Sequence, residues 1–263
     1  MRVVSLILAS GKGSRLYPLS TEDKPKQFLR LYNDRTMIEN TMFRFLPYVD
    51  EVYGVTLERY RKWIQSRIPR MFYEPDRKES AFSVLYGLRE IKEIENDCIV
   101  IQTPSDHYID VDPSFFLALK ESIVHARKGK IVAIGVKPSS PDPNYGYMKK
   151  RQNHLFHDFI EKPKQGLAKI LIDEGFLWNT AIYVYRLSDM MKEFHRFEPE
   201  MMSAADRDLY QMDARQFEES IIKRTHRLKI VEGFFDWDDI GTHQRLQRKR
   251  GEINGRTKDE INA

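Results

Sequence analysis

A nearly continuous apolar run followed by a glycine-rich turn opens the chain, and it constrains the fold more than any other stretch. Residues 3–8 read Val-Val-Ser-Leu-Ile-Leu, which is typical of a strand buried on both faces of a parallel sheet. Gly11 and Gly13 allow a tight turn that brings backbone N–H groups close to an anion. Arg15 adds a fixed cationic fork that matches phosphate oxygens. This stretch therefore predicts a loop that binds a polyphosphate.

Two better-known phosphate motifs are excluded by the spacing. A P-loop places its Lys directly after a second glycine, and Lys12 comes too early for that pattern. A dinucleotide fingerprint needs a third small residue where this chain has Leu16. An ordinary strand-to-helix loop is the alternative interpretation. A second cation, Lys26, follows shortly after the first, as binding of a triphosphate would require.

The composition is that of a globular domain. Hydrophobic residues make up 41% and charged residues 31% of the 263 residues. The net charge of +4 suits anionic substrates and does not require nucleic acid as a partner. The single cysteine, Cys98, lies in an apolar run, so we expect a buried thiol. No run is long enough to cross a bilayer and no signal pattern precedes the first strand, so the cytoplasm is the expected compartment.

Short apolar runs alternate with helical patterns, which predicts an α/β fold with a doubly wound, mainly parallel sheet and helices on both of its faces. In such a fold the loops at the carboxyl ends of the strands bind the ligand. The expected strands are 3–8, 51–56, 71–73, 98–102, 131–136, 147–150, 156–161 and 181–186. The expected helices are 37–45, 60–64, 80–91, 115–126, 164–173, 187–193 and 215–223.

The glycine-rich stretch also carries a family resemblance. Residues 8–20, with Pro-Lys-Gln-Phe at 25–28, resemble the signature of sugar-phosphate nucleotidylyltransferases, most closely mannose-1-phosphate guanylyltransferases. The resemblance implies the Rossmann-like nucleotide-diphospho-sugar transferase fold. It also implies catalytic roles for Arg15 and Lys26 on the nucleotide phosphates, whereas Ser10 stands where the family usually has Gly. The loop residues implied to bind nucleotide are Leu8, Ala9, Ser10, Gly11, Lys12, Gly13, Ser14 and Arg15.

A Tyr-Glu-Pro step at 73–75 follows a predicted strand and is a candidate for base recognition. Guanine presents two adjacent donors that one carboxylate can accept, whereas uracil and thymine present one donor between two acceptors. A turn with an exposed glutamate is the alternative interpretation. The resemblance implies that Glu74 binds the base and that Ser80 stands beside it.

An aspartate at a strand's carboxyl end, beside a phosphate loop, is well placed to hold Mg²⁺, which prefers hard oxygen ligands and few protein contacts. Asp106 has this place in Thr-Pro-Ser-Asp-His at 103–107, where the resemblance implies a metal ligand and a nucleotide contact through Pro104. It implies Asp239 as the second ligand and Mg²⁺ as the cofactor. We expect His107 to be a structural, hydrogen-bonded histidine.

Three further motifs resemble the family's sugar-phosphate site. Gly146 lies in Asn-Tyr-Gly-Tyr, Glu161 and Lys162 lie in Phe-Ile-Glu-Lys-Pro, and Asn179 lies in Trp-Asn-Thr-Ala-Ile-Tyr. The resemblance implies that Glu161 and Asn179 bind sugar hydroxyls and that Lys162, a catalytic residue, binds the sugar's 1-phosphate. Ala181 replaces the family's usual Gly.

The motifs appear in family order from about residue 6 to residue 246. We expect one catalytic domain at 1–247 and a frayed polar tail at 248–263, without a left-handed β-helix or an isomerase domain. The expected substrates are GTP and mannose 1-phosphate, giving GDP-mannose and pyrophosphate by Mg²⁺-assisted in-line attack on the α-phosphorus. Two alternatives stay open: another base or sugar 1-phosphate, such as a heptose or glucose, and a non-catalytic regulatory relative that binds nucleotide sugar. We expect no nucleic-acid or membrane partner, and a homodimer is compatible with the sequence.

Overall fold

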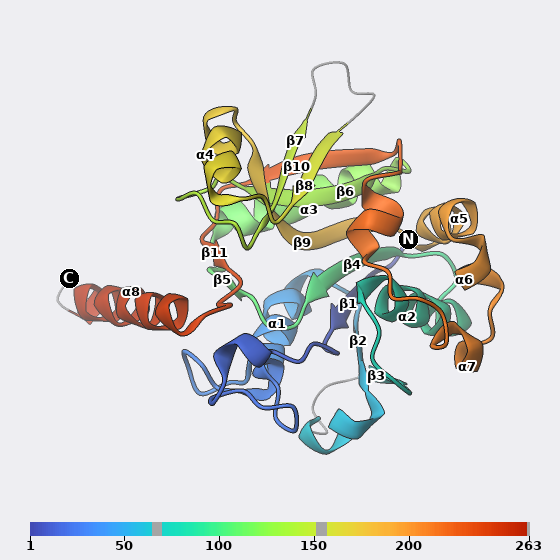
Figure 1. Cartoon of the computed structure of the whole chain (residues 1–263), viewed down its shortest axis with the longest axis horizontal. Helices are drawn as coiled ribbons and strands as arrows, with labels where there is room; N and C mark the ends of the chain where they lie inside the picture. Colours follow the sequence, from blue (N-terminus) through green and yellow to red (C-terminus); the bar gives the residue numbers. More distant parts are fainter. Residues whose placement is uncertain (65–69, 151–156, 262–263) are drawn as a thin grey trace.

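A central mixed sheet organises the computed structural model, which describes residues 1–64, 70–150 and 157–261 (Figure 1). Within these residues the sheet has nine strands, and its main path runs β10-β6-β9-β4-β1-β2-β3. The strands of that path are β1 Val3–Leu8, β2 Glu51–Leu57, β3 Arg70–Glu74, β4 Ile99–Pro104, β6 Ile131–Val136, β9 Leu177–Arg186 and β10 Leu228–Gly233.

The strand pairing divides the sheet into a parallel part and a mixed part. β1 lies between β2 and β4 and is parallel to both, and β3 extends this part in parallel. β9 is antiparallel to both β4 and β6, whereas β10 is parallel to β6. The hairpin of β7 (Gly146–Lys150) and β8 (His157–Glu161) attaches to β9. The predicted α/β fold with a mainly parallel sheet is therefore confirmed.

Helices cover both faces of this sheet, as predicted (Figure 1). They are α1 Met37–Phe45, α2 Ser80–Ile94, α3 Pro113–Arg127, α4 Gln165–Asp173, α5 Leu187–Phe197, α6 Pro199–Ser203, α7 Asp206–Leu209 and α8 His243–Ile261. A capping box between Thr36 and Glu39 starts α1, and the Asp112 side chain caps α3, so side chains satisfy backbone donors at both helix starts.

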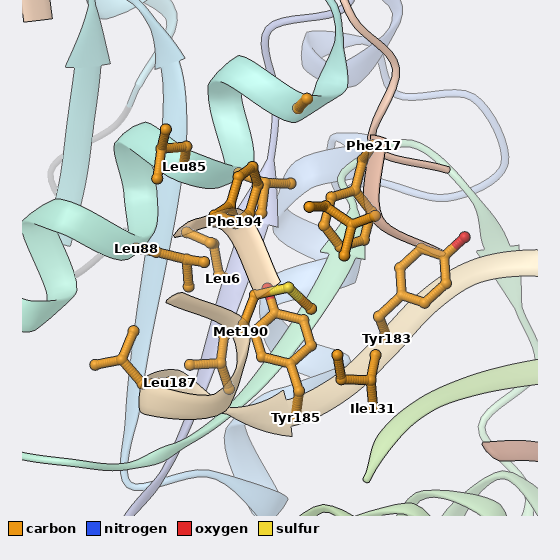
Figure 2. Close-up of a cluster of buried hydrophobic side chains, with 14 of the residues drawn as sticks. Leu6, Leu85, Leu88, Ile131, Tyr183, Tyr185, Leu187, Met190, Phe194 and Phe217 are labelled. Atoms are coloured by element: carbon orange, nitrogen blue, oxygen red, sulfur yellow. The ribbon is translucent and has the colours of Figure 1, made fainter. Parts of the chain in front are cut away.

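Alternating residues of β1 enter different parts of the core. Leu6 packs in the cluster that contains Leu85 and Leu88 of α2 and Phe194 of α5 (Figure 2). Ile7 packs on the other face of the strand, with α1. Both side chains are almost wholly buried, which confirms that β1 is covered on both faces. Cys98 is buried as expected, and burial raises the pKa of its thiol to about 12.

The structure refines two predicted helices and corrects the prediction for the tail. The helix predicted at 60–64 is a 3₁₀ helix that spans Glu58–Trp63. A π-helix spans Glu218–Ile222 within the predicted helix 215–223. The tail is not frayed over its described length, because α8 extends through Ile261. Residues 156, 262 and 263 of the predicted elements lie outside the described residues.

Ion pairs hold the first half of the polar helix α8 in place. Lys249 is buried and lies 2.9 Å from Asp236, and Arg248 pairs with Asp238. These contacts tie α8 to the short antiparallel pair β5 (Tyr108–Ile109) and β11 (Trp237–Asp238). Within residues 1–64, 70–150 and 157–261, no helix combines the length and the apolar character that a bilayer crossing requires.

Candidate active site

The glycine-rich loop leaves β1 and is held by a second predicted segment. The Gln27 amide donates to the carbonyls of Ala9 and Gly11, at 2.7 and 2.9 Å. Gly13 has a φ of +60°, and a Cβ there would lie 2.5 Å from the Lys26 Cβ. The absence of a side chain at Gly13 therefore lets Lys26 approach the loop. Sequence reasoning had given Gln27 no role, although it belongs to the Lys-Gln pair of the motif.

Four predicted residues from distant segments meet at the carboxyl ends of β1 and β4. The Lys26 ammonium lies 3.1 Å from Asp106 Oδ2 and donates to the backbone carbonyl of Asp239. Arg15 lies 3.4 Å from Asp239 Oδ2. The β5–β11 pairing places Tyr108 opposite Asp238, so the aspartates that flank this pair come together. The structure thus joins Arg15, Lys26, Asp106 and Asp239 in one cluster.

The two aspartates of this cluster are ionised at neutral pH. Burial alone would raise the pKa of both carboxyl groups, but nearby cations outweigh it and lower both pKa values. Lys26, His107 and Arg15 lower the pKa of Asp106, and the same three groups together with Arg245 lower that of Asp239. The structure therefore holds carboxylate oxygens and cationic side chains together at one site.

This donor set fits Mg²⁺ better than a structural metal. Asp106 and Asp239 supply hard carboxylate oxygens, and no group of three or more His, Cys, Asp or Glu side chains forms a metal cage in the described part of the chain. Mg²⁺ usually takes one or two protein carboxylates and completes its shell with water and substrate phosphates. Asp106 and Asp239 are thus the residues that would hold it.

Asp239 is oriented by neighbours that the sequence did not reveal. Its Oδ1 accepts from the Gly241 N–H at 2.9 Å and the Tyr145 hydroxyl at 3.3 Å, and it pairs with Arg245. Tyr145 belongs to a predicted motif, but nothing in the local pattern marks Arg245. Asp238 is buried and accepts from the Ile240 N–H, so it fixes the turn that carries Asp239.

His107 has the structural role that was expected. Burial lowers the pKa of its imidazole. Its Nδ1 lies 3.2 Å from the Trp237 Nε1, whose N–H donates to it, and the two rings meet edge to face. The histidine thus connects the Asp106 loop to β11.

Glu74 is enclosed rather than exposed. The side chain is fully buried and accepts hydrogen bonds from Ser10, from Ser83 at 2.9 Å and from Tyr210 at 2.8 Å. Burial raises the pKa of its carboxyl group. The interpretation as a turn with an exposed glutamate is wrong. A base could reach this carboxylate only if the hydroxyl groups moved, so the structure does not support the predicted base contact.

Ser80, predicted beside the base, is also engaged within the protein. Its hydroxyl accepts from the Phe217 N–H at 2.9 Å. Pro104 lies opposite Leu8 in the β1–β4 register, which places it next to the glycine-rich loop. Of the remaining predicted loop residues, Gly11, Lys12 and Ser14 are exposed beside Arg15.

The predicted sugar-phosphate residues form a second group on β7, β8 and β9. Gly146 pairs with Glu161 across the hairpin, and a Cβ at Gly146 would lie 2.8 Å from Glu161 Oε2. The Lys162 ammonium lies 3.0 Å from Glu161 Oε1. Asn179 lies close by as well, because a Cβ added at Gly146 would be 3.5 Å from the Asn179 Cβ. The structure thus brings all four predicted residues together.

A β-bulge shapes the strand that carries Asn179. Gly135 of β6 pairs with Asn179 and Ile134 pairs with Ile182, so the two residues between them have no partner in this register. Ala181 is one of them and has a φ of +56°, a conformation that favours glycine. This positive φ explains why a glycine would suit the position, as in the family pattern that the sequence resembles.

Glu218 joins this group and was not expected from the sequence. The Asn179 amide donates to the Tyr183 hydroxyl at 2.8 Å, which in turn donates to Glu218 at 3.1 Å. Burial, together with the charge of Glu161, raises the pKa of the Glu218 carboxyl group. Glu218 starts the π-helix, and π-helices often occur at functional sites, but the sequence pattern reads as an ordinary helix.

Comparison with known proteins identifies the family of this chain. The family described as "Nucleotidyl transferase" matches residues 4–254. This chain belongs to that family. A mannose-1-phosphate guanylyltransferase of Sinorhizobium fredii is 26% identical over 92% of this chain and 54% of its own length. The alginate biosynthesis protein AlgA of Pseudomonas syringae is 26% identical over 91% of this chain and 56% of its own length. The chain thus spans about half the length of these curated relatives.

Solved structures give the same result for the fold. A Thermus thermophilus protein titled mannose-1-phosphate geranyltransferase superposes with a TM-score of 0.84 at 29% identity, covering 94% of this chain and 79% of that protein. A Bacillus anthracis protein titled as a putative glucose-1-phosphate thymidylyltransferase has a TM-score of 0.65 at 19% identity, covering 95% and 94% of the two chains. The second likeness concerns the fold alone.

Proposed function

We propose that this nucleotidyl transferase domain makes GDP-mannose and pyrophosphate from GTP and mannose 1-phosphate. The observation that carries the proposal is the cluster of Arg15, Lys26, Asp106 and Asp239 beside the glycine-rich loop. The names of the relatives in Sinorhizobium fredii and Thermus thermophilus support the choice of a mannose phosphate.

In this reaction an oxygen of the sugar phosphate attacks the α-phosphorus of the nucleotide, and pyrophosphate leaves. Both partners are anions, so the protein must neutralise charge and align the reacting groups. Arg15 and Lys26 would bind the triphosphate and the leaving group. Bound Mg²⁺, held by Asp106 and Asp239, would supply Lewis-acid neutralisation of phosphate charge.

The second group of residues would bind the nucleophile. Lys162 would hold the 1-phosphate, and Glu161 and Asn179 would bind sugar hydroxyls. Glu218 lies within hydrogen-bond distance of Tyr183 and in the electrostatic field of Glu161, so we assign it to the same sugar-binding wall. No residue is needed as a general base, because the attacking phosphate oxygen is already deprotonated.

Pyrophosphate release tests this proposal directly. Each of the four ribonucleoside triphosphates would be combined with a panel of hexose and heptose 1-phosphates in the presence of Mg²⁺. We expect release with GTP and mannose 1-phosphate. Release with a different pair would retain the chemistry and overturn the substrate assignment. No release with any pair, together with binding of nucleotide sugar, would favour a regulatory relative.

A further inference from the structure

A pocket outside the proposed active site is built around a buried arginine. It has a volume of about 400 Å³ and lies between the segment before α1, α1 itself, the β5 segment and α8. Arg44 of α1 lines it and is only 5% exposed. The Arg44 Nε is buried without a hydrogen-bond partner. The wall of the pocket therefore contains a buried guanidinium, one of whose nitrogens has no hydrogen-bond partner.

The charge of Arg44 has no carboxylate partner among the residues that the structure describes. Its guanidinium donates to the hydroxyls of Tyr32 and Thr41 and to the backbone carbonyl of His107, the last at 3.1 Å. None of the ion pairs among the described residues includes Arg44. Burial accordingly lowers the pKa of the group. A buried cation without a counter-charge is unfavourable, because its hydration is lost and nothing compensates it, whereas a bound anion would offset that loss.

The other walls favour an anion that carries an apolar part. Arg35 is a second cation on the pocket, and the Asn33 and Asn40 amides line it as well. Asp110 also borders the pocket, and it makes interactions of its own. The aromatic rings are those of Tyr32, Phe43 and Tyr108, and the Phe43 side chain is 43% exposed.

We propose that this pocket is a second binding site, distinct from the phosphate cluster at Arg15 and Lys26, for a small organic phosphate whose phosphate meets Arg44 and Arg35 and whose apolar part lies on the aromatic wall. Arginine forks bind phosphate oxygens with well-defined geometry. A volume of about 400 Å³ exceeds the roughly 30 Å³ share of one water and falls in the range of ligand pockets. The Arg44–His107 contact places the site one hydrogen bond from the loop that carries Asp106.

Selenate tests the location, because it mimics phosphate and selenium gives an anomalous X-ray signal. Crystals of the full chain and of Lys26→Met would be soaked in it. We expect an anomalous peak within hydrogen-bond distance of the Arg44 guanidinium in both, and none there in Arg44→Met. Peaks confined to the Arg15 and Lys26 cluster, or no peak near Arg44 in the wild-type crystals, would overturn the proposal.

Phenyl phosphate tests the ligand class in solution. In the Lys26→Met background, calorimetry should show at least tenfold tighter binding of phenyl phosphate than of inorganic phosphate. Phe43→Ala should remove that difference, and Arg44→Met should weaken phenyl phosphate at least tenfold. Arg196→Met, an exposed arginine on α5, is the matched control and should leave the affinity unchanged. Equal affinity for both phosphates, or unchanged affinity in Arg44→Met, would contradict the proposal.

Thermal unfolding separates this role from a structural one. Without phosphate, Arg44→Met should unfold at the wild-type temperature or above it, since an apolar residue replaces an uncompensated charge. Phenyl phosphate should raise the unfolding temperature of the wild type but not of the variant. If Arg44→Met fails to fold, Arg35→Gln should weaken the binding instead. The proposal would be overturned if Arg44→Met unfolded at a much lower temperature than the wild type without ligand and phenyl phosphate did not raise the unfolding temperature of the wild type. Arg44 would then have a structural role only.

Discussion

The phosphate cluster and the sugar-phosphate group are built in different ways. Arg15, Lys26, Asp106 and Asp239 come from four distant segments, and ion pairs between them compensate their charges before any substrate binds. Gly146, Glu161 and Asn179 lie on neighbouring strands, where close backbone approach and a β-bulge fix their places. The first region depends on charge balance, and the second on backbone geometry. Substitutions should therefore affect the two regions differently.

Removal of a charge from the phosphate cluster should have the largest effect. Asp106→Asn deletes one of the two carboxylates that would hold Mg²⁺, while the side chain keeps its size. We expect Mg²⁺-dependent pyrophosphate release to fall about 10³-fold, corresponding to about 4 kcal/mol of lost transition-state stabilisation. Circular dichroism should show a folded protein. Asp112→Asn, which keeps a capping side chain at α3, is the control, and near wild-type turnover in Asp106→Asn would refute the metal assignment.

Loss of Lys162 should affect one substrate only. Lys162→Ala removes an ammonium that is more than half exposed and lies beside Glu161. We expect the KM for the sugar 1-phosphate to rise about 10- to 100-fold, or about 1.4 to 2.7 kcal/mol, with little change in the KM for the nucleotide. Steady-state kinetics with each substrate varied in turn measures this difference. Substitution of the exposed Lys164 by Ala is the matched control. An equal change in both KM values in Lys162→Ala would contradict the assignment of the two regions to different substrates.

Glu74 should reveal its burial through the pH dependence of stability. Its folded-state pKa is raised, so the folded protein binds this proton more tightly than the unfolded chain, whose glutamate pKa is about 4.3. Protonated Glu74 therefore contributes fully to stability below the unfolded-state pKa. This contribution is lost as the pH rises through the folded-state pKa of Glu74. Glu74→Gln should therefore show a smaller loss of unfolding free energy between about pH 4 and pH 7. Denaturant unfolding at several pH values checks this, and a slope identical to the wild type and to the exposed control Glu79→Gln would contradict it.

We expect the smallest effect from a substitution in the β-bulge of β9. Ala181 adopts a φ of +56°, which costs a non-glycine residue about 1–2 kcal/mol. Glycine removes that cost but gains freedom in the unfolded chain, so Ala181→Gly should stabilise the protein by a net amount of about 0.5–1 kcal/mol. The unfolding temperature should rise by about 1–3 °C. Ala168→Gly, inside α4, should lower it, and a fall in Ala181→Gly would show that packing rather than backbone geometry controls this position.

Local patterns in the sequence were enough for much of the fold. The predicted bounds of α1 and β6 agree with the structure, because their apolar periodicity is clear and capping residues mark the helix start. The tail was misread because its pattern is polar, and the ion pairs of Arg248 and Lys249 with β11 and the residue before it are long-range contacts. The helix predicted at 215–223 contains a π-helix at 218–222, a type that the sequence did not reveal because its hydrophobic pattern barely differs from that of an α-helix.

The sequence by itself determined which residue types carry the proposed chemistry, since glycines, cations and aspartates stand in recognisable motifs along one chain. Only the tertiary structure decided what each of them contacts. It placed Arg245 and Tyr145 on Asp239, and it enclosed Glu74 with Ser10, Ser83 and Tyr210. It also brought Glu218 to the sugar-binding wall and left Arg44 without a carboxylate partner among the described residues. The physical reason is that motifs record local backbone and residue type, whereas burial and charge pairing depend on which distant segments the fold brings together.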